Sequence, residues 1–344
     1  MLWPDNVLVI AELSCNHRGR WSEAYELMLA ASRAGADAVK IQLYTPDTMT
    51  LDLPQFRVAE GQWAGRTLYD LYAETQTPGE GAKPLQGVAC DLGLKFIVSV
   101  YDPSSLSFAE EHLDVWAYKV ASFELTDAHL LRLVKRTGKR IIASLGMSNL
   151  SDFDLALAAL EGDDPYGLEK VAFLHCVTNY PAPVAEMNLG KIRWMVNYLY
   201  DRVHMQDEVN VGFSDHSLSV EVPALAVAAG ATIIEKHLTL SRANGSQDAA
   251  FSLEPDEFTE MVSRIRHAES AFGKPTADGE AVYRPYRRSV HAVRDIADGE
   301  VFTPDNVKTL RAEGGVTDLD MVYGRVATRA VARGEPVTRD DLRP

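Results

Sequence analysis

The chain has 344 residues, enough for a barrel domain of about 250 residues with a small second domain, or for two domains of ordinary size. Its 34 Lys and Arg against 49 Asp and Glu give a net charge of −15. This charge excludes a general nucleic-acid or anionic-membrane binder, because such binding needs an excess of positive charge on the docking face.

Composition and cysteine usage indicate the class and the compartment of the protein. Hydrophobic residues make up 46% and charged residues 24%, which is typical of a globular protein with a sizeable core. The N-terminal residues show no secretory signal, and the longest nearly uncharged stretch, 222–234, is too short to cross a bilayer. Cys15, Cys90 and Cys176 are an odd, scattered set, which favours a reducing compartment. We therefore expect a cytoplasmic protein without a membrane segment.

Eight short β-rich runs recur up to residue 237, each followed by a segment of helical length. They cover 7–13, 38–42, 95–100, 116–120, 140–145, 171–176, 210–215 and 232–237. Their nearly continuous apolar character is typical of strands buried on both faces, and the intervening helices supply the crossovers that parallel pairing requires. The pattern predicts a (β/α)8 TIM barrel of the α/β class. A doubly wound open sheet is the structural alternative, but no Gly-x-Gly-x-x-Gly follows the first run.

The connecting segments differ in helical character. Residues 22–34 repeat apolar positions three and four apart and predict a helix with Ser22 as its cap and Gly35 at its end. Residues 79–92 contain two interior glycines and a proline, which are costly in a helix, so we expect a broken or loop-like piece. Residues 44–77 are long for a connection and predict a segment that folds over the barrel mouth.

The amino-acid composition of the sequence changes near Gly273. Residues 274–288 are rich in Pro, Gly and charge and read as a linker between a barrel at 1–273 and a domain at 289–344. Five positions of the tail recur 35 residues later: Arg294, Ile296, Gly299, Glu300 and Asp305 become Arg329, Val331, Gly334, Glu335 and Asp340. The repeat predicts a small pseudo-symmetric β domain with a shared core.

Polar residues gather at the C-terminal ends of the predicted strands, the face of a barrel where active sites form. They are Glu12, Lys40, Gln42, Ser99, Lys119, Ser122, Ser144, His175, Ser214, Asp215, His216, Glu235, Lys236 and His237. Neighbouring strands end at His216 and His237. Two neutral imidazoles with oxygen ligands suit Mn²⁺, Zn²⁺, Co²⁺ or Fe²⁺, so this pair predicts a metal site. His17 and His175 are interpreted as orienting or packing groups.

Two lysines, Lys40 and Lys119, end the second and fourth predicted strands. A buried ammonium is costly to desolvate unless it is paired, so these lysines indicate an anionic ligand between them. The hydroxyls that could complete a phosphate or carboxylate cradle are those of Ser99, Ser122, Ser144 and Ser214. One alternative is a pair of structural lysine–glutamate bridges, with Glu12 and Glu124 as partners. Another is a Schiff-base lysine, which nearby metal ligands make less attractive.

Several motifs, in order, resemble the sialic acid synthase family (N-acetylneuraminate synthase-like). They are Ala11-Glu12 with Asn16-His17, GADAVK at 35–40, AYKVAS at 117–122, YPAP at 180–183, GFSDH at 212–216 and IEKH at 234–237. The likeness spans nearly the whole chain, and the tail resembles the antifreeze-protein-like SAF domain of that family. Segments 44–51, 67–69, 121–124 and 241–255 resemble the pseudaminic acid synthase branch more than the N-acetylneuraminate branch.

That resemblance implies condensation of phosphoenolpyruvate with an open-chain N-acetylated amino sugar, giving a nine-carbon 2-keto acid and phosphate. The first candidate acceptor is 2,4-diacetamido-2,4,6-trideoxy-L-altrose. The resemblance also implies a divalent metal ion, Mn²⁺ before Mg²⁺ or Co²⁺, and a homodimer with exchanged C-terminal domains. No nucleic-acid or membrane partner is implied.

The resemblance carries site residues over position by position. His216 and His237 match the metal ligands, with Glu12 as a water- or metal-positioning carboxylate. The phosphoenolpyruvate cradle is matched by Lys40, Ser99, Lys119, Ser122, Ser144 and Ser214. Gln42, Tyr180 and Asp248 match sugar contacts, and Glu124 is a further candidate for substrate binding. Arg311 matches an arginine that the tail of a partner subunit inserts into the neighbouring barrel.

Other functions remain open at this point. An N-acetylneuraminate or legionaminic acid synthase would use the same site residues with another acceptor. A metal-dependent aldolase that uses free pyruvate would keep the barrel and the metal pair. A non-catalytic protein that binds a sugar or a phosphate would keep the fold alone.

Overall fold

The computed structural model describes residues 3–59, 63–77, 79–162, 168–203, 210–273 and 279–343. The chain divides into two compact units, Met1–Phe272 and Gly273–Pro344. The boundary falls where the composition of the sequence changes. Each unit has its own hydrophobic core.

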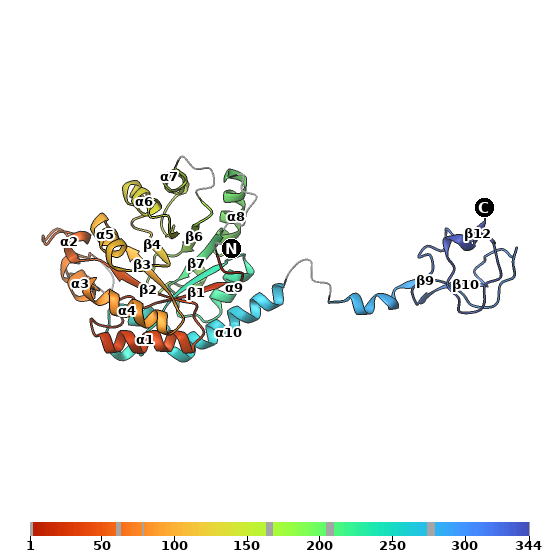
Figure 1. Cartoon of the computed structure of the whole chain (residues 1–344), viewed down its shortest axis with the longest axis horizontal. Helices are drawn as coiled ribbons and strands as arrows, with labels where there is room; N and C mark the ends of the chain where they lie inside the picture. The colour runs from red at the N-terminus through yellow and green to blue at the C-terminus, as the bar shows by residue number, and fades with distance from the viewer. Residues whose placement is uncertain are drawn as a thin grey trace. The chain divides into compact units, whose positions relative to one another are not determined.

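The first unit is a closed barrel of eight parallel strands inside a ring of helices (Figure 1). The strands are β1 (Leu8–Glu12), β2 (Ala38–Leu43), β3 (Lys95–Val100), β4 (Ala117–Val120), β5 (Arg140–Ser144), β6 (Val171–Cys176), β7 (Asn210–Asp215) and β8 (Ile233–His237). Each pairs with the next in parallel, and β8 pairs with β1 to close the barrel. The predicted (β/α)8 barrel is therefore confirmed, and the open-sheet alternative is excluded.

The core of the barrel unit has two layers, because side chains alternate between the two faces of each strand. In β1, Leu8 and Ile10 point into the barrel, whereas Val9 and Ala11 join the layer between strands and helices. The inner layer contains Leu8, Ile10, Ala38, Ile97, Ala117, Ile142, Ala172, Leu174 and Ile233. Two residues further along, the same inward rows continue into Glu12, Lys40, Ser99, Lys119, Ser144 and Glu235. The barrel interior thus changes from apolar to polar and charged toward the C-terminal ends of the strands.

Ten α-helices lie in the described part of the barrel unit. They are α1 (Trp21–Arg33), α2 (Pro46–Met49), α3 (Leu68–Thr75), α4 (Gly79–Asp91), α5 (Pro103–His112), α6 (Ala128–Arg136), α7 (Leu150–Glu161), α8 (Gly190–Val203), α9 (Val222–Ala228) and α10 (Pro255–Phe272). Helix α1 ends as predicted, with Gly35 at a φ of +85°. Its predicted cap is wrong: the N-cap is Arg20, without a side-chain cap, and Ser22 lies inside the first turn.

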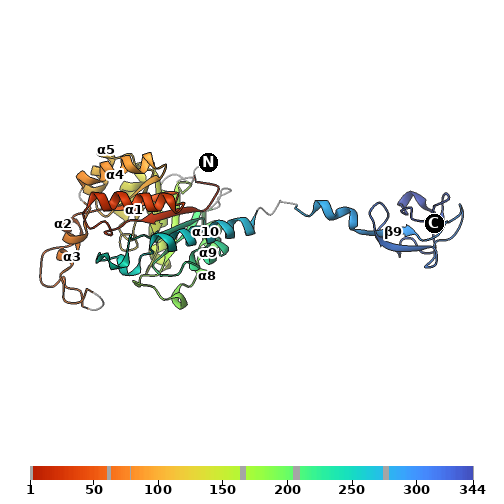
Figure 2. The same ribbon diagram turned by 90° about the horizontal axis from the view of Figure 1, so that it is seen from below.

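Helix α4 corrects the prediction of a broken piece at 79–92. It runs over Gly79–Asp91 with Pro84 in its interior and packs against α1 (Figure 2). A Cβ added at Gly81 would lie 1.5 Å from the Trp21 ring of α1, so the missing side chain permits close helix packing. Ala82, Leu85 and Ala89 are buried in the same core. Tertiary packing therefore outweighs the low helix propensity of these residues.

The second unit contains two small antiparallel sheets around one core. Its elements are the 3₁₀ helix η4 (Ala281–Tyr286), strands β9 (Arg288–Ala292), β10 (Val307–Arg311), β11 (Val326–Ala327) and β12 (Leu342–Arg343), and the 3₁₀ helix η5 (Arg339–Asp341). Strand β9 pairs with β10, and β11 pairs with β12. Within the interval predicted as a linker, 274–278 lies outside the described residues, η4 follows, and β9 begins at Arg288.

The predicted repeat of the tail is confirmed by matching contacts. Arg294 pairs with Glu300 at 2.6 Å, and 35 residues later Arg329 pairs with Glu335 at 3.0 Å. In both copies the glutamate also accepts a backbone N–H three residues upstream. Ile296 and Val331 pair in an antiparallel bridge and belong to one shared core.

Throughout the described ranges, no helix has both the length and the apolar character needed to span a membrane.

Candidate functional site

Strand register brings the predicted polar residues together at one end of the barrel. Glu12 of β1 lies opposite Lys40 of β2 on one side and His237 of β8 on the other. Across the next strands, Ser99 of β3 lies opposite Gln42 and Lys119. Closure of the barrel therefore makes neighbours of residues that are more than 200 positions apart in the sequence.

Four side chains form what we call the charged cluster: Glu12, Lys40, Lys119 and Glu235, all buried. Lys40 pairs closely with Glu12 and lies 3.6 Å from Glu235. Lys119 lies 3.2 Å from the same Oε1 atom of Glu235. The cluster therefore holds two lysines and two carboxylates.

The electrostatics of the charged cluster follow from burial and from pairing. Burial works to raise the pKa of Glu235, but Lys119 and Lys40 together outweigh it and lower this pKa to about 2. Burial raises the pKa of Glu12 in spite of Lys40, and it lowers the pKa of Lys119 in spite of Glu235. Burial also opposes the charged form of Lys40, yet the attraction of Glu12 and Glu235 leaves its pKa raised.

The lysine–glutamate bridges considered from the sequence are thus partly present. Glu12 is the partner of Lys40, as that alternative named. The partner of Lys119 is Glu235, not Glu124, so the second bridge was assigned wrongly. The sequence reasoning placed Glu235 in the polar ring and gave it no role, because its contacts depend on which strands the closed barrel makes adjacent.

The four predicted hydroxyls lie at strand ends but differ in their contacts. The Lys40 ammonium donates to Ser99 Oγ at 3.1 Å, and Ser214 Oγ donates to Glu235 at 3.0 Å. Ser122 Oγ lies 3.1 Å from the Cys176 sulfur. Ser144 Oγ is buried and has no hydrogen-bond partner among the described residues. Ser99 and Ser214 are therefore hydrogen-bonded to the charged cluster, and Ser144 has free hydrogen-bonding capacity.

Glu124 follows β4 and carries a buried carboxylate oxygen without a hydrogen-bond partner in the described part of the chain. Burial raises the pKa of Glu124 to about 7, and the nearby Lys119 opposes this only in part. A carboxyl group with such a pKa exists in both protonation states near neutral pH. It can therefore donate or accept a hydrogen bond toward a ligand.

The two predicted metal ligands face each other. The His216 and His237 ring centres are 5.7 Å apart with an angle of 64° between the planes. A ligating nitrogen lies about 2.1 Å from a metal ion, so two rings that share an ion have centres up to about 6.5 Å apart. Within the described segments no group of three His, Cys, Asp or Glu side chains has the arrangement of a metal site. In those segments the histidine pair is therefore not completed by a third such side chain, and any further ligands would have to come from other groups.

The protonation of the histidine pair fits a ligand role. His216 Nδ1 donates to the Val177 carbonyl at 2.8 Å if the ring is the Nδ1–H tautomer, which leaves the Nε2 lone pair free. His237 Nδ1 has no hydrogen-bond partner among the described residues and lies 3.8 Å from Asp248. Burial lowers the pKa of His216 to about 4 and that of His237 well below its usual range. Both rings are therefore neutral at pH 7, as metal binding requires.

The other two histidines have the packing roles expected of them. His17 is buried, lies 3.1 Å from the Thr77 hydroxyl and stacks on Trp21. His175 is buried and contacts the Met187 carbonyl at 2.8 Å.

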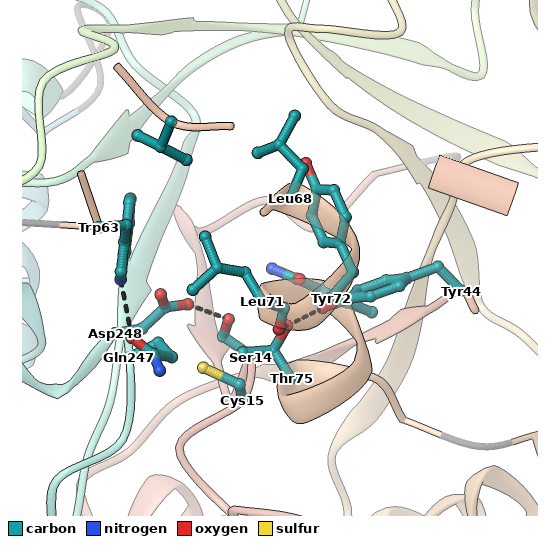
Figure 3. A pocket seen from close by; sticks show the side chains of 12 residues that line it. Ser14, Cys15, Tyr44, Trp63, Leu68, Leu71, Tyr72, Thr75, Gln247 and Asp248 are labelled. Atoms are coloured by element: carbon teal, nitrogen blue, oxygen red, sulfur yellow. Dashed lines mark hydrogen bonds between the residues drawn. The ribbon is translucent and has the colours of Figure 1, made fainter. Parts of the chain in front are cut away.

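A pocket of about 170 Å³, which we call the mouth pocket, opens beside the charged cluster (Figure 3). It is lined by Ser14, Cys15, Gln42, Tyr44, Val58, Trp63, Leu68, Leu71, Tyr72, Thr75, Gln247 and Asp248. The segment 44–77 supplies most of this lining, which confirms that it folds over the barrel mouth; its residues 60–62 lie outside the description. Gln42 reaches toward Glu12 at 3.5 Å, and Asp248 accepts from Ser14. These two residues join the pocket to the charged and histidine sites.

Tyr180 lies beside the histidine pair, whereas Arg311 lies in the second unit. The Tyr180 ring lies 4.3 Å from the His216 ring and 5.0 Å from the Phe251 ring, so it belongs to the histidine site and not to the lining of the mouth pocket. Arg311 is exposed at the end of β10 in the second unit, opposite Arg288. Its role in a partner's barrel stays a prediction.

Two residues without a predicted role support the histidine loop. The Lys236 ammonium is fully buried, pairs with Asp215 at 2.6 Å, and donates to the carbonyls of Ser217 and Ser219. Asp215 also accepts the Ser217 backbone N–H at 2.8 Å. The residues on either side of His216 are therefore fixed to β8.

Comparisons with known proteins identify the class of this barrel. The chain matches the NeuB family over residues 27–277 and the SAF domain over residues 287–343. The protein therefore belongs to the NeuB family and carries a C-terminal SAF domain.

Individual relatives are similar over nearly the whole chain. A pseudaminic acid synthase of Campylobacter jejuni is 36% identical over 347 residues, covering 98% of this chain and 97% of the relative. An N,N'-diacetyllegionaminic acid synthase of Legionella pneumophila is 30% identical, covering 91% and 87%. The crystal structure of N-acetylneuraminic acid synthetase from Leptospira borgpetersenii has a TM-score of 0.70 at 25% identity and covers 81% of this chain and 90% of that chain. These three relatives are thus named as synthases of nonulosonic acids.

Proposed function

We propose that the protein is a nonulosonic acid synthase that condenses phosphoenolpyruvate with an N-acetylated amino sugar. The observation that carries the proposal is the charged cluster with its two buried lysines, together with the pair of neutral histidines at the barrel mouth. We further propose a pseudaminic type of acceptor, a diacetamido trideoxy hexose. The identity of 36% with a pseudaminic acid synthase supports this choice.

Lys40 and Lys119 are the proposed donor site. Both ammonium groups share one oxygen of Glu235, whose second oxygen has no hydrogen-bond partner among the described residues. A donor that carries a phosphate and a carboxylate can replace this carboxylate as their partner and can also use the free hydroxyl of Ser144. Such a ligand satisfies buried polar atoms that otherwise remain costly.

His216 and His237 are the residues that would hold a divalent cation, with Mn²⁺ our first choice. Their neutral rings and the free Nδ1 of His237 fit that role. A divalent cation bound there supplies Lewis-acid polarisation of the aldehyde oxygen of the acceptor.

The mouth pocket is the proposed acceptor site. Its polar groups, Gln42 and Asp248, lie toward the charged cluster and the histidines, and its apolar groups include Val58, Leu68 and Leu71. This division suits a sugar whose reacting aldehyde enters the polar side while its methyl and acetamido groups contact the apolar side. Among the described residues the lining contains no Lys or Arg, which disfavours a phosphorylated acceptor.

In the proposed reaction, carbon 3 of the enol phosphate forms a bond to the aldehyde carbon, and the aldehyde oxygen takes up a proton to become a hydroxyl. Water adds at carbon 2 and gives up its protons, and phosphate leaves with the electrons of its C–O bond. The two lysines hold the donor against the acceptor, and such alignment contributes several kcal/mol. Glu12, the carboxylate in register with both Lys40 and His237, is placed to hold the proton that the water gives up.

We propose a cytoplasmic homodimer with exchanged C-terminal domains as the working assembly. Exposed apolar side chains follow the C-terminal ends of four successive strands, β4 to β7: Phe123, Met147, Leu150, Val184 and Leu218. Apolar side chains that gather on one face favour a protein partner. Arg311 and its neighbour Leu310 are exposed on the second unit. Cys15, Cys90 and Cys176 are free, which supports a reducing compartment.

The test is incubation of the purified protein with Mn²⁺, phosphoenolpyruvate and a panel of 2-acetamido and diacetamido sugars, followed by assays of phosphate and of the keto acid. We expect phosphate release that depends on sugar, with the diacetamido trideoxy acceptor as the best substrate. Preference for a legionaminic-type or N-acetylmannosamine acceptor would keep the reaction and change the substrate. Product from free pyruvate, or no release with any sugar, would overturn the proposal.

A further inference from the structure

The outer wall of the mouth pocket is tied to the β8–α10 loop through one side chain, Gln247. The Trp63 indole N–H donates to Gln247 Oε1 at 2.7 Å, as Figure 3 shows. The Gln247 amide Nε2 donates to Glu74 at 3.1 Å. Trp63 and Glu74 lie before and inside helix α3, so one amide contacts the wall of the pocket at two points.

The chemistry of these contacts requires an amide at position 247. Its oxygen faces a donor, the Trp63 N–H, and its nitrogen faces an acceptor, the Glu74 carboxylate. A glutamate would offer two acceptors and place a negative charge beside Glu74, and a leucine would offer neither bond. Glu74 is itself fixed by Arg66, at 2.6 Å and 2.9 Å.

The helix held by these contacts supplies the apolar wall of the pocket. Leu68, Leu71, Tyr72 and Thr75 all belong to α3 and line the mouth pocket. The contacts made by Gln247 therefore set the distance between this wall and the polar floor at Asp248, the next residue in the chain. A change in that distance alters the space for the groups that distinguish one acceptor sugar from another.

We propose that Gln247 is a specificity-determining positioning residue: it clamps helix α3 over the acceptor sugar and thereby selects the substituents of that sugar. This assignment rests on the proposed function, because it takes the mouth pocket as the acceptor site. The clamp itself is a property of the chain and has a readout that needs no substrate.

The kinetic test compares Gln247→Leu and Gln247→Glu with the matched variant Gln76→Leu. Gln76 is an amide at the end of the same helix that bonds within its own turn, to the Ala73 carbonyl, and does not line the pocket. We expect KM for the acceptor to rise about tenfold in both Gln247 variants, since the leucine loses both hydrogen bonds and the glutamate loses the bond to Glu74 and adds a like charge beside it. KM for phosphoenolpyruvate should stay within about twofold of wild type, and the preference for the diacetamido over the monoacetamido acceptor should fall.

The rescue test exchanges the two partners. The double substitution Gln247→Glu with Glu74→Gln restores one donor and one acceptor in swapped positions, and we expect it to recover acceptor KM and selectivity relative to Gln247→Glu alone. A general loss of packing would not be repaired in this way. Failure of the double variant to recover either quantity would overturn the clamp.

Hydrogen–deuterium exchange of residues 67–75 separates this inference from the proposed function. We expect faster exchange in Gln247→Leu than in Gln76→Leu or wild type, with no sugar present. If the wild-type protein uses no acceptor sugar but exchange is faster in Gln247→Leu, the proposed function is wrong. The contacts by which Gln247 holds helix α3 are then still supported. Unchanged exchange, or an equal rise of KM for both substrates, would contradict the role of Gln247.

Discussion

At the scale of single residues, the site is defined by buried charged groups, several of whose polar atoms have no hydrogen-bond partner among the described residues. The inward rows of the barrel turn polar in their last positions, so ammonium, carboxylate and imidazole groups share one enclosed space. The sequence predicts the two lysines and the two histidines because strand ends of a barrel meet on one face. It does not predict that Glu235 bridges both lysines, because this depends on the register and closure of the strands.

The raised pKa of Glu124 predicts a pH-dependent stability. Its pKa is about 7 in the folded protein against 4.5 as the ordinary value, so between these values the folded state keeps a proton that the unfolded state has lost. The stabilisation is complete below about pH 4.5 and is lost as the pH rises through 7. Glu124→Gln mimics the protonated form. Its free energy of unfolding should equal that of wild type at pH 5 and be about 2 kcal/mol higher than that of wild type at pH 8.

Urea unfolding at the two pH values measures this difference. The exposed Glu26 provides a control, since Glu26→Gln should leave the pH dependence of wild type unchanged. Equal stability of Glu124→Gln and wild type at pH 8 would contradict the assignment.

Lys236 predicts a large effect on stability from one buried ion pair. Lys236→Met leaves the buried Asp215 carboxylate without its cation, which should lower the free energy of unfolding by about 3–5 kcal/mol. The double variant with Asp215→Asn removes both charges and should lose less than Lys236→Met alone. Chemical denaturation of wild type and the two variants checks this order, and a loss of unfolding free energy below about 1 kcal/mol in Lys236→Met would refute it.

At the scale of elements, the strands are more predictable than the helices. All eight strands of the barrel are confirmed, because burial on both faces produces apolar runs that single-sequence patterns detect. Helix α4 was not predicted, because its glycines serve contacts with Trp21 and Phe108 that come from distant parts of the chain. The repeat in the tail was predicted because its Arg–Glu pairs are local in sequence.

Two glycines of α4 provide a matched test of this interpretation. A Cβ at Gly81 would overlap the Trp21 ring, whereas a Cβ at Gly87 meets no atom within 4 Å. Gly81→Ala should therefore destabilise the protein by about 1–3 kcal/mol through overpacking. Gly87→Ala should stabilise it by about 0.5–1 kcal/mol through helix propensity. Thermal unfolding of both variants measures the signs, and a stabilising Gly81→Ala would show that the close packing is not needed.

At the scale of the whole molecule, the NeuB barrel is followed in the chain by a small SAF domain. If Arg311 acts in the barrel of a partner subunit, a chain that lacks residues 289–344 should fold its barrel and lose turnover. The sequence resemblance implies this arrangement, in which Arg311 acts between subunits.

Complementation tests the exchange of domains. His237→Ala and Arg311→Ala chains should each be inactive, but coexpression should give about a quarter of wild-type activity, because half of the dimers are mixed and each mixed dimer has one complete site. No recovered activity would mean that Arg311 acts in its own chain, and full activity of Arg311→Ala alone would mean that Arg311 has no role in turnover.

The most direct measurement is an anomalous diffraction map of crystals grown with Mn²⁺ and phosphoenolpyruvate. The account predicts one manganese peak within ligand distance of both His216 and His237, with the donor phosphate or carboxylate contacting Lys40 and Lys119. A peak elsewhere, or a donor bound away from these lysines, would contradict it.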